Sequence, residues 1–142
     1  MAPAIRNHPA KEQGYLLPKV KVLVVHEDSA LLVYYRHVLE GLGLDVLTAN
    51  TYAAGLAYLD QETFGFVVVS EGSRAFEGRR LLERALEGAR RTPVLVVTRC
   101  HDLSKYLDAM QLGAVDYLEE PIRVADMERV VTTHLRASRS AA

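Results

Sequence analysis

Four short polar runs in this sequence carry the side chains that could do chemistry. They are His26 to Asp28, Ser70 to Glu71, Thr98 to Arg99 and Glu119 to Glu120. A serine hydroxyl, an imidazole and a carboxylate are the nucleophile, base and orienting group of one kind of covalent catalysis. A histidine next to two acids can also bind a divalent metal such as zinc. Either kind of site requires a fold that brings the runs together.

Each polar run follows a short apolar stretch that predicts a β-strand. Phe66 to Val69 is the clearest, because four apolar residues between two glycines are typical of a strand buried on both faces at the centre of a parallel sheet. Three further stretches precede the other runs, namely Val20 to Val25, Pro93 to Val97 and Val115 to Leu118. The stretch Leu44 to Thr48 predicts a fifth strand.

Apolar residues at helical spacing separate these strands. They predict five helices, at Ala30 to Glu40, Ala53 to Leu59, about Glu77 to Glu87, a segment capped by Asp102 or Ser104 that ends at Leu112, and about Val124 to Arg136. Strands that alternate with helices predict a doubly wound α/β fold, in which five helices flank a five-stranded parallel sheet. In such a sheet, ligands bind beyond the carboxyl ends of the strands, which is where all four polar runs are expected.

Composition limits the classes of function. The 142 residues are 49% hydrophobic and have a net charge of −1, which fits one globular domain and gives no general attraction for nucleic acid or an anionic membrane. No stretch approaches the roughly 20 apolar residues that span a bilayer. The single cysteine, Cys100, suits a reducing compartment, so we expect a cytoplasmic protein.

The predicted elements divide the chain into three parts. Residues 1–18 contain prolines and mixed charges without apolar periodicity, which predicts a flexible N-terminal extension. Residues 19–136 form the domain, and residues 137–142 are expected to be a disordered tail.

From Lys19 to Arg136 the sequence resembles the receiver domain of two-component response regulators, which has a flavodoxin-like fold. Several motifs in register carry the resemblance: the acidic turn after Val24-Val25, the spacing from Ser70 to Glu77-Gly78, the position of Thr98, and Gly113-Ala114-Val115-Asp116-Tyr117-Leu118-Glu119-Glu120-Pro121 in place of the family's Gly-Ala-x-x-Tyr-x-x-Lys-Pro. In this family, acids after the first strand hold Mg²⁺ and an aspartate at the end of the third strand accepts a phosphoryl group from a histidine kinase. A threonine and a lysine then bind that group.

The sequence departs from the family at the phosphoacceptor and at the metal site. Ser70 stands at the phosphoacceptor position, and its hydroxyl cannot form an aspartyl phosphate. His26 stands at the first acid, which leaves Glu27 at the second and Asp28 at a variable position. With so few carboxylates, Mg²⁺ binding is expected to be weak or absent, and we predict no metal and no other cofactor.

The phosphate-binding positions also change. Glu120 replaces the lysine and would repel a phosphate, while Arg99 follows Thr98 where the family usually has a small residue and could fill the pocket. Thr98 is retained, and Tyr117 matches an aromatic residue that couples the site to the partner-binding face in the family. We expect Glu120 to pair with Arg99 or His26 in a self-contained polar cluster.

The resemblance implies a stand-alone signalling domain of a bacterial two-component or phosphorelay pathway. We predict a pseudo-receiver, not an enzyme, which acts by protein–protein interaction without aspartyl phosphorylation. Its partner would be a histidine kinase, an effector or another regulator, and the face formed by the fourth and fifth helices and the fifth strand could form a homodimer.

Three alternatives remain open from the residues alone. Ser70 with His26 and either Glu27 or Asp28 could form the site of a small enzyme or ligand binder, although Ser70 lies in no Gly-x-Ser-x-Gly motif. Ser70 could instead be phosphorylated by a Ser/Thr kinase. The run His26 to Asp28 could bind zinc.

Overall fold

The structure is a computed structural model that describes residues 19–87 and 91–141. The strands are β1 Lys21–Val25, β2 Asp45–Ala49, β3 Phe66–Ser70, β4 Val94–Thr98 and β5 Asp116–Glu119, and the helices of the described ranges are α3 Ser29–Gly41, α4 Tyr52–Gln61, α5 Arg79–Ala85, α6 Leu103–Leu112 and α7 Val124–Ala141. The predicted extension at residues 1–18 lies outside the described residues.

All five strands are parallel and lie in the order β2-β1-β3-β4-β5. This confirms the predicted doubly wound sheet. Because the chain moves from β1 to β2 on one side and then crosses to β3 on the other, the order reverses between β1 and β3. In α/β proteins, ligands commonly bind at the carboxyl ends of the strands beside such a reversal.

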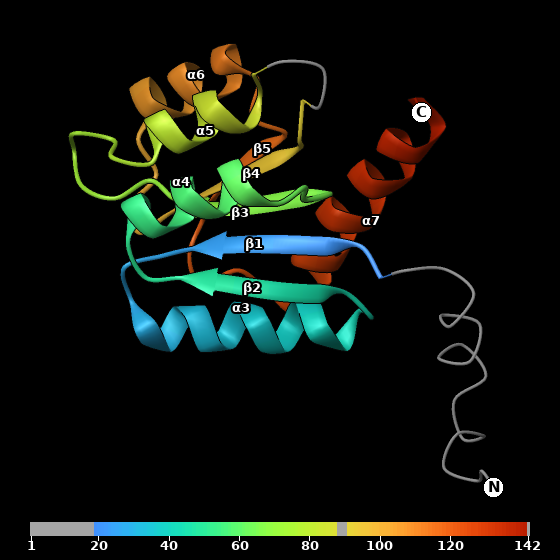
Figure 1. Cartoon of the computed structure of the whole chain (residues 1–142). Coiled ribbons are helices and arrows are strands. Elements are labelled where there is room, and N and C mark those ends of the chain that lie inside the picture. The colour runs from blue at the N-terminus through green and yellow to red at the C-terminus, as the bar shows by residue number, and fades with distance from the viewer. Residues whose placement is uncertain (1–18, 88–90, 142) are drawn as a thin grey trace, which may run out of the picture.

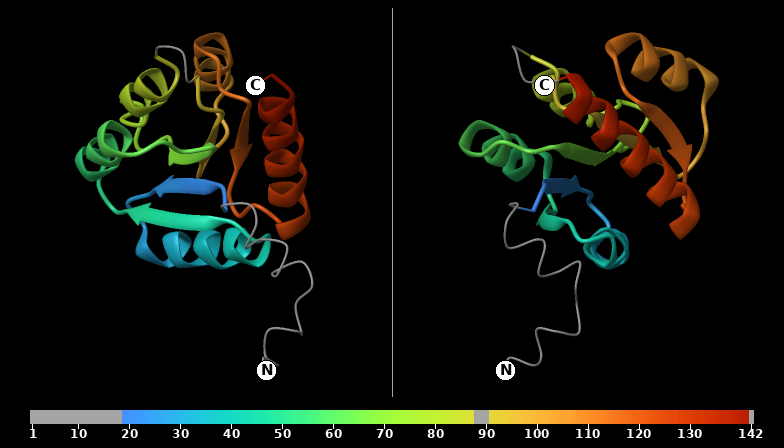
Figure 2. Two further views of the ribbon diagram at one scale, coloured as in Figure 1. Left: turned by 45° about the vertical axis from the view of Figure 1, so that its right-hand side comes forward. Right: turned by 90° about the vertical axis from the view of Figure 1, so that its right-hand side faces the viewer.

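The helices cover both faces of the sheet (Figure 1). Helices α3 and α7 pack on one face and contact each other, whereas α4, α5 and α6 cover the other face (Figure 2). Successive residues of β3 enter opposite layers: Val67 and Val69 pack under α4 and α5, and Phe66 and Val68 pack under α3 and α7. All five residues of β3 are buried, as expected for a central strand.

Side-chain caps fix where the helices begin. Asp28 Oδ1 accepts hydrogen bonds from the backbone N–H groups of Ala30 and Leu31 at the start of α3. Thr51 caps α4 and Asp102 caps α6, while Gly113 (φ +111°) ends α6 in the left-handed conformation. These caps hold the loops that follow β1, β2 and β4.

The start of α5 and the end of α7 differ from the prediction in ways that have a local cause. Helix α5 begins at Arg79, after the expected Glu77, because the chain at Phe76 has a φ of +55° and Glu77 is bonded back to Ser73. Helix α7 continues through Ala141, beyond the expected end near Arg136, and the disorder expected of residues 137–142 stays a prediction. The sequence after Arg136 contains alanines and no helix breaker, which allows the helix to continue.

Candidate functional site

The imidazole of His26 lies at the end of β1 and is almost completely buried, with 1% of its side chain exposed. The strand register continues to this residue, because its backbone N–H donates to Ala49 O. Its Nδ1 accepts a hydrogen bond of 3.0 Å from the backbone N–H of Asp28. The ring proton is therefore on Nε2, which donates to Glu120 Oε2 at 2.8 Å, and both nitrogens are used.

Glu120 follows β5, and 5% of its side chain is exposed. Its Oε2 accepts a second hydrogen bond, of 2.5 Å, from the hydroxyl of Tyr35 on α3. Its Oε1 is buried and has no hydrogen-bond partner among the described residues. Together His26, Tyr35 and Glu120 form a buried polar cluster, which we call the His26–Glu120 cluster. The expected pairing of Glu120 with His26 is confirmed.

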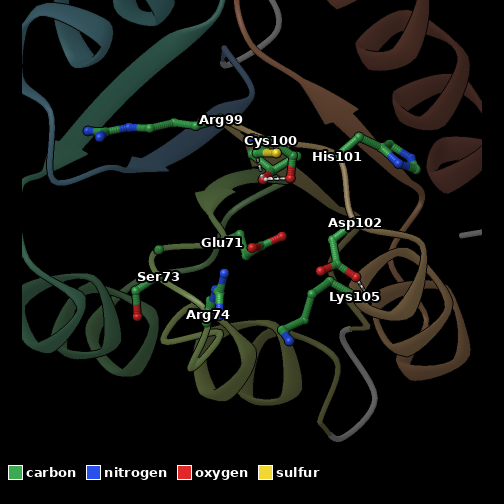
Figure 3. Close-up of a pocket in the computed structure, with 10 residues that line it drawn as sticks. Glu71, Ser73, Arg74, Arg99, Cys100, His101, Asp102 and Lys105 are labelled. Atoms are coloured by element: carbon green, nitrogen blue, oxygen red, sulfur yellow. Dashed lines mark hydrogen bonds between the residues drawn. The ribbon is translucent and has the colours of Figure 1, made fainter.

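The side chains of Asp28 and Glu27, the other residues of the acidic turn, form no hydrogen bond with Glu120 within the described residues. Asp28 Oδ1 is occupied by the cap of α3, and Asp28 Oδ2 lies 3.8 Å from a guanidinium nitrogen of Arg99. The side chain of Arg99 is 67% exposed and points away from the other labelled residues of Figure 3. Glu27 is exposed, with Oε1 3.5 Å from His26 Nδ1.

Ser70 lies at the end of β3 and is 4% exposed. Its Oγ accepts a hydrogen bond of 3.2 Å from the backbone N–H of Gly72, and its carbonyl accepts one of 3.1 Å from the hydroxyl of Tyr52. The following loop packs closely on this carbonyl, because a Cβ at Gly78 would lie 2.2 Å from Ser70 O. In the described part of the chain, no hydrogen bond joins Ser70 to His26.

Thr98 and Tyr117, the two predicted switch residues, are both buried. Thr98 Oγ1 donates to Cys100 O and accepts from the backbone N–H of Cys100, so it closes the turn after β4. The hydroxyl of Tyr117 donates to Glu71 Oε1, directly after Ser70. The ring of Tyr117 is therefore turned toward the carboxyl edge of the sheet.

An aromatic cluster holds the Tyr117 ring from the other side. His101 meets it edge-on with 5.2 Å between ring centroids, and Tyr106 of α6 meets it at 5.9 Å. Offset and edge-on contacts of this kind stabilise aromatic pairs. Tyr117 thus connects the loop after β3 with the loop after β4 and the first turn of α6.

Burial and hydrogen bonds to carboxylates raise the pKa of several tyrosines at this edge. Burial first, and then the hydrogen bond to Glu71, raises the pKa of Tyr117 to about 12. Burial and the hydrogen bond to Glu120 raise the pKa of Tyr35 far above its ordinary value. Burial also raises the pKa of Tyr52 to about 12. These phenols therefore stay protonated and act as donors at neutral pH.

A pocket of about 240 Å³ lies between the loops that follow β3 and β4 (Figure 3). Glu71 and Thr98 lie at its base, and Arg74 and Lys105 line it with Asp102. Figure 3 shows the carboxylate of Glu71 pointing into this space, whereas the ring of His101 points away from it. Ser70 and the His26–Glu120 cluster are not among the residues that line the pocket.

The residues present do not fit a Mg²⁺ ion. That ion prefers six oxygen ligands, of which a protein commonly supplies one or two carboxylates. Here the histidine nitrogens, one Asp28 oxygen and the Ser70 hydroxyl already have protein partners. Across residues 19–87 and 91–141, no group of three or more His, Cys, Asp or Glu is placed to hold a metal.

Tyr35 was not identified as a member of the site from the sequence, and Glu71 was named there in a polar run without being given a role. In the sequence, Tyr35 is one of several apolar residues at helical spacing. Its hydroxyl donates to Glu120 because the fold packs α3 against the sheet. Glu71 reads as part of a polar loop, and its bond to Tyr117 spans residues far apart in the sequence. The adjacency of Glu71 to the end of a central strand is the one signal that could have singled it out.

Comparisons with known proteins identify the family. The family model described as the response regulator receiver domain matches residues 22–132. The chain belongs to this family. It is a receiver domain of the kind found in two-component signalling, and its five-stranded parallel sheet with flanking helices is the fold of that family.

Individual relatives of this receiver domain are distant. The chain is 28% identical over 124 residues to the transcriptional regulatory protein FixJ of Bradyrhizobium diazoefficiens, and the match covers 87% of the chain and 60% of that protein. It is 32% identical over 101 residues to the alginate biosynthesis transcriptional regulatory protein AlgB of Pseudomonas aeruginosa, covering 71% of the chain and 22% of that protein. The chain therefore spans less than two thirds of the length of these relatives.

The structural comparison agrees. A CheY-like receiver domain protein from Methanospirillum hungatei superposes with a TM-score of 0.80 at 25% identity, covering 87% of this chain and 99% of that one. No helix within the described ranges has the length and apolar character needed to cross a membrane.

Proposed function

We propose that this receiver domain signals by binding another protein and does so without aspartyl phosphorylation. The observation that carries the proposal is the pairing of His26 with Glu120, at the positions where the family places a metal-binding acid and a phosphate-binding lysine. A buried imidazole–carboxylate pair occupies the space in which charge neutralisation of a phosphoryl group would be required.

The nucleophile supports the same proposal. A serine hydroxyl at the end of β3 needs a base to become nucleophilic. The nearest candidate in the sequence, His26, has its acceptor nitrogen bonded to the backbone of Asp28. With 4% of its surface exposed, Ser70 is also poorly accessible to a protein kinase.

Charge argues against entry of a phosphoryl group. Glu120 has a buried oxygen without a hydrogen-bond partner among the described residues, so an anion brought near it would add repulsion to an already costly carboxylate. The positions that the family gives to the phosphoacceptor, a metal-binding acid and the phosphate-binding lysine carry a hydroxyl, an imidazole and a carboxylate here.

The output surface we propose is the face formed by α6, β5 and α7. Two large apolar side chains on α6 are exposed, Leu103 at 66% and Leu107 at 49%. They lie one helical turn apart and so share a face of α6. A histidine kinase, an effector, another regulator or a second copy of the chain could pack against them.

The test is a titration with beryllofluoride and Mg²⁺, and separately with acetyl phosphate and Mg²⁺, followed by backbone amide spectra. We expect no saturable change at the amides of residues 70–72, 98–100 and 120. Saturable shifts confined to these amides, abolished by chelation of Mg²⁺, would overturn the proposal. A variant that combines His26→Asp, Ser70→Asp and Glu120→Lys serves as the positive arm, because it restores the family's residues on the same scaffold.

A further inference from the structure

The pocket between the loops after β3 and β4 contains charged groups that the proposed function does not use. Three cationic and two acidic side chains line it, which leaves an excess of one positive charge. Arg99 is turned toward Asp28, and Asp102 caps α6 through its Oδ1. The groups that remain are one carboxylate, Glu71, and the two cations Arg74 and Lys105.

Glu71 is the most constrained of these groups. It is 7% exposed, and its backbone N–H donates to Val97 O, which fixes its position at the edge of the sheet. One carboxylate oxygen accepts the hydroxyl of Tyr117, which is a neutral donor. Within the described part of the chain, no cation is bonded to it. A buried carboxylate without a counter-charge is costly, so an ammonium group bound beside it would be strongly favoured.

Arg74 and Lys105 lack counter-charges as well. Neither side chain forms an ion pair with any residue that the structure describes. They come from different elements, the loop after β3 and the first turns of α6, and both border the space into which Glu71 points (Figure 3). Two cations on the rim of one pocket favour a ligand with two anionic groups.

We infer that this pocket binds a small acidic amino acid, a molecule with one ammonium group and two carboxylates. The ammonium group would pair with Glu71, and the carboxylates would pair with Arg74 and Lys105. The net charge of −1 on such a ligand balances the excess positive charge of the lining. On the same measure one water molecule needs about 10–15 Å³, so the pocket of about 240 Å³ has room for a molecule of about ten non-hydrogen atoms.

Binding at Glu71 would act on the receiver's switch region directly. The carboxylate that receives the ligand is the one that holds the Tyr117 hydroxyl. The ring of Tyr117 contacts His101 and Tyr106 at the start of α6. Occupancy would therefore reinforce the inward position of Tyr117 and change the environment of α6, without any contact with Ser70. The inference thus goes beyond the proposed function and does not depend on it.

Amide spectra of the full chain, titrated with L-glutamate at constant ionic strength, test the inference. We expect saturable shifts at Gly72, Thr98 and Tyr117 in the millimolar range or below. Glutarate lacks the ammonium group and γ-aminobutyrate lacks one carboxylate, so each should bind at least about tenfold more weakly, which is about 1.4 kcal/mol. No saturable shift with L-glutamate, or equal binding of glutarate, would overturn the inference.

Variants assign the contacts. Glu71→Gln keeps an acceptor for Tyr117 and should weaken L-glutamate binding at least about tenfold. The double variant Arg74→Gln, Lys105→Gln leaves Glu71 intact and should abolish saturation, whereas Glu128→Gln, on the exposed surface of α7, should bind as the natural chain does. Undiminished binding by both pocket variants would contradict the assignment. A response to beryllofluoride would overturn only the proposed function, and a missing response to L-glutamate only this inference.

Discussion

His26 Nε2 donates to Glu120 Oε2 across 2.8 Å, and both side chains are buried at the carboxyl edge of the sheet. The opposite ring nitrogen accepts the backbone N–H of Asp28, so the turn that begins α3 also sets the tautomer of the imidazole. One hydrogen bond between residues far apart in the sequence thus joins the end of β1 to the loop after β5.

The hydroxyl of Tyr35 is the second donor to this carboxylate, and Tyr35→Phe should reveal its contribution. A hydrogen bond to a charged acceptor contributes about 1.5–3 kcal/mol, so we expect the free energy of unfolding to fall by that amount. Tyr34→Phe is the matched control, because the neighbouring hydroxyl donates to a neutral acceptor, Ile122 O, and its loss should cost only about 0.5–1.5 kcal/mol. Urea denaturation of both variants measures the difference, and equal losses would contradict the stronger hydrogen bond assigned to Tyr35 and Glu120.

Two substitutions of His26, one charged and one neutral, test how much a second negative charge beside Glu120 destabilises the fold. His26→Asp restores an acid, but it places a second carboxylate beside the buried Glu120, so we expect a loss of about 3–5 kcal/mol or failure to fold. Asparagine has nearly the same size as aspartate but no charge, so the His26→Asn variant should be clearly more stable than the His26→Asp variant. Adding Glu120→Lys to His26→Asp should recover most of the loss, because it replaces like-charge repulsion by an ion pair. Urea midpoints measure all three, and an His26→Asp variant as stable as His26→Asn would contradict the role given to Glu120.

The sequence predicts the fold well because the same feature, a short apolar stretch followed by a helical pattern, occurs several times along the chain. The apolar stretches at Phe66 to Val69 and Val22 to Val25 are buried on both faces, and a strand of that kind requires helices on both sides. The helix boundaries were predicted less well at α5, where Gly78 and the positive φ of Phe76 delay the first turn. Such loop geometry depends on contacts with Ser70 that a pattern of apolar residues does not encode.

The site was predicted in part for a similar reason. The spacing of the family's motifs is enough to predict which positions Ser70 and Glu120 occupy. The partners that they acquire depend on side-chain direction across the sheet, so the sequence offered both Arg99 and His26 to Glu120, and packing selected His26. Tyr35 and Glu71 have roles that arise only from contacts between distant elements.

Gly78 should be intolerant of any side chain. A Cβ there would lie 2.2 Å from the carbonyl oxygen of Ser70, which belongs to the central strand and cannot move freely. We expect Gly78→Ala to destabilise the domain by about 1–3 kcal/mol. Gly41→Ala is the control, since a Cβ at the end of α3 has no atom within 4 Å and should be neutral or slightly stabilising. A Gly78→Ala variant as stable as the natural chain in urea would show that the loop after β3 adjusts.

The raised pKa of Tyr117 should make the free energy of unfolding depend on pH in the alkaline range. Its pKa rises from 10 in the unfolded chain to about 12 in the folded one, chiefly through burial and then through the bond to Glu71. The folded state therefore keeps a proton that the unfolded state releases. The stabilisation is fully present below pH 10 and is lost as the pH rises to about 12, by an amount on the order of 1–3 kcal/mol.

Tyr117→Phe isolates this contribution. The variant lacks both the hydrogen bond to Glu71 and the titrating group, so it should be less stable than the natural chain at pH 8. The difference should shrink between pH 10 and 12, where only the natural chain loses the Tyr117 contribution. Urea denaturation across this range measures the difference, with Tyr106→Phe as a comparison for general alkaline effects in the same aromatic cluster. A difference that stays constant or grows with pH would show that the phenol of Tyr117 is not held protonated by the fold.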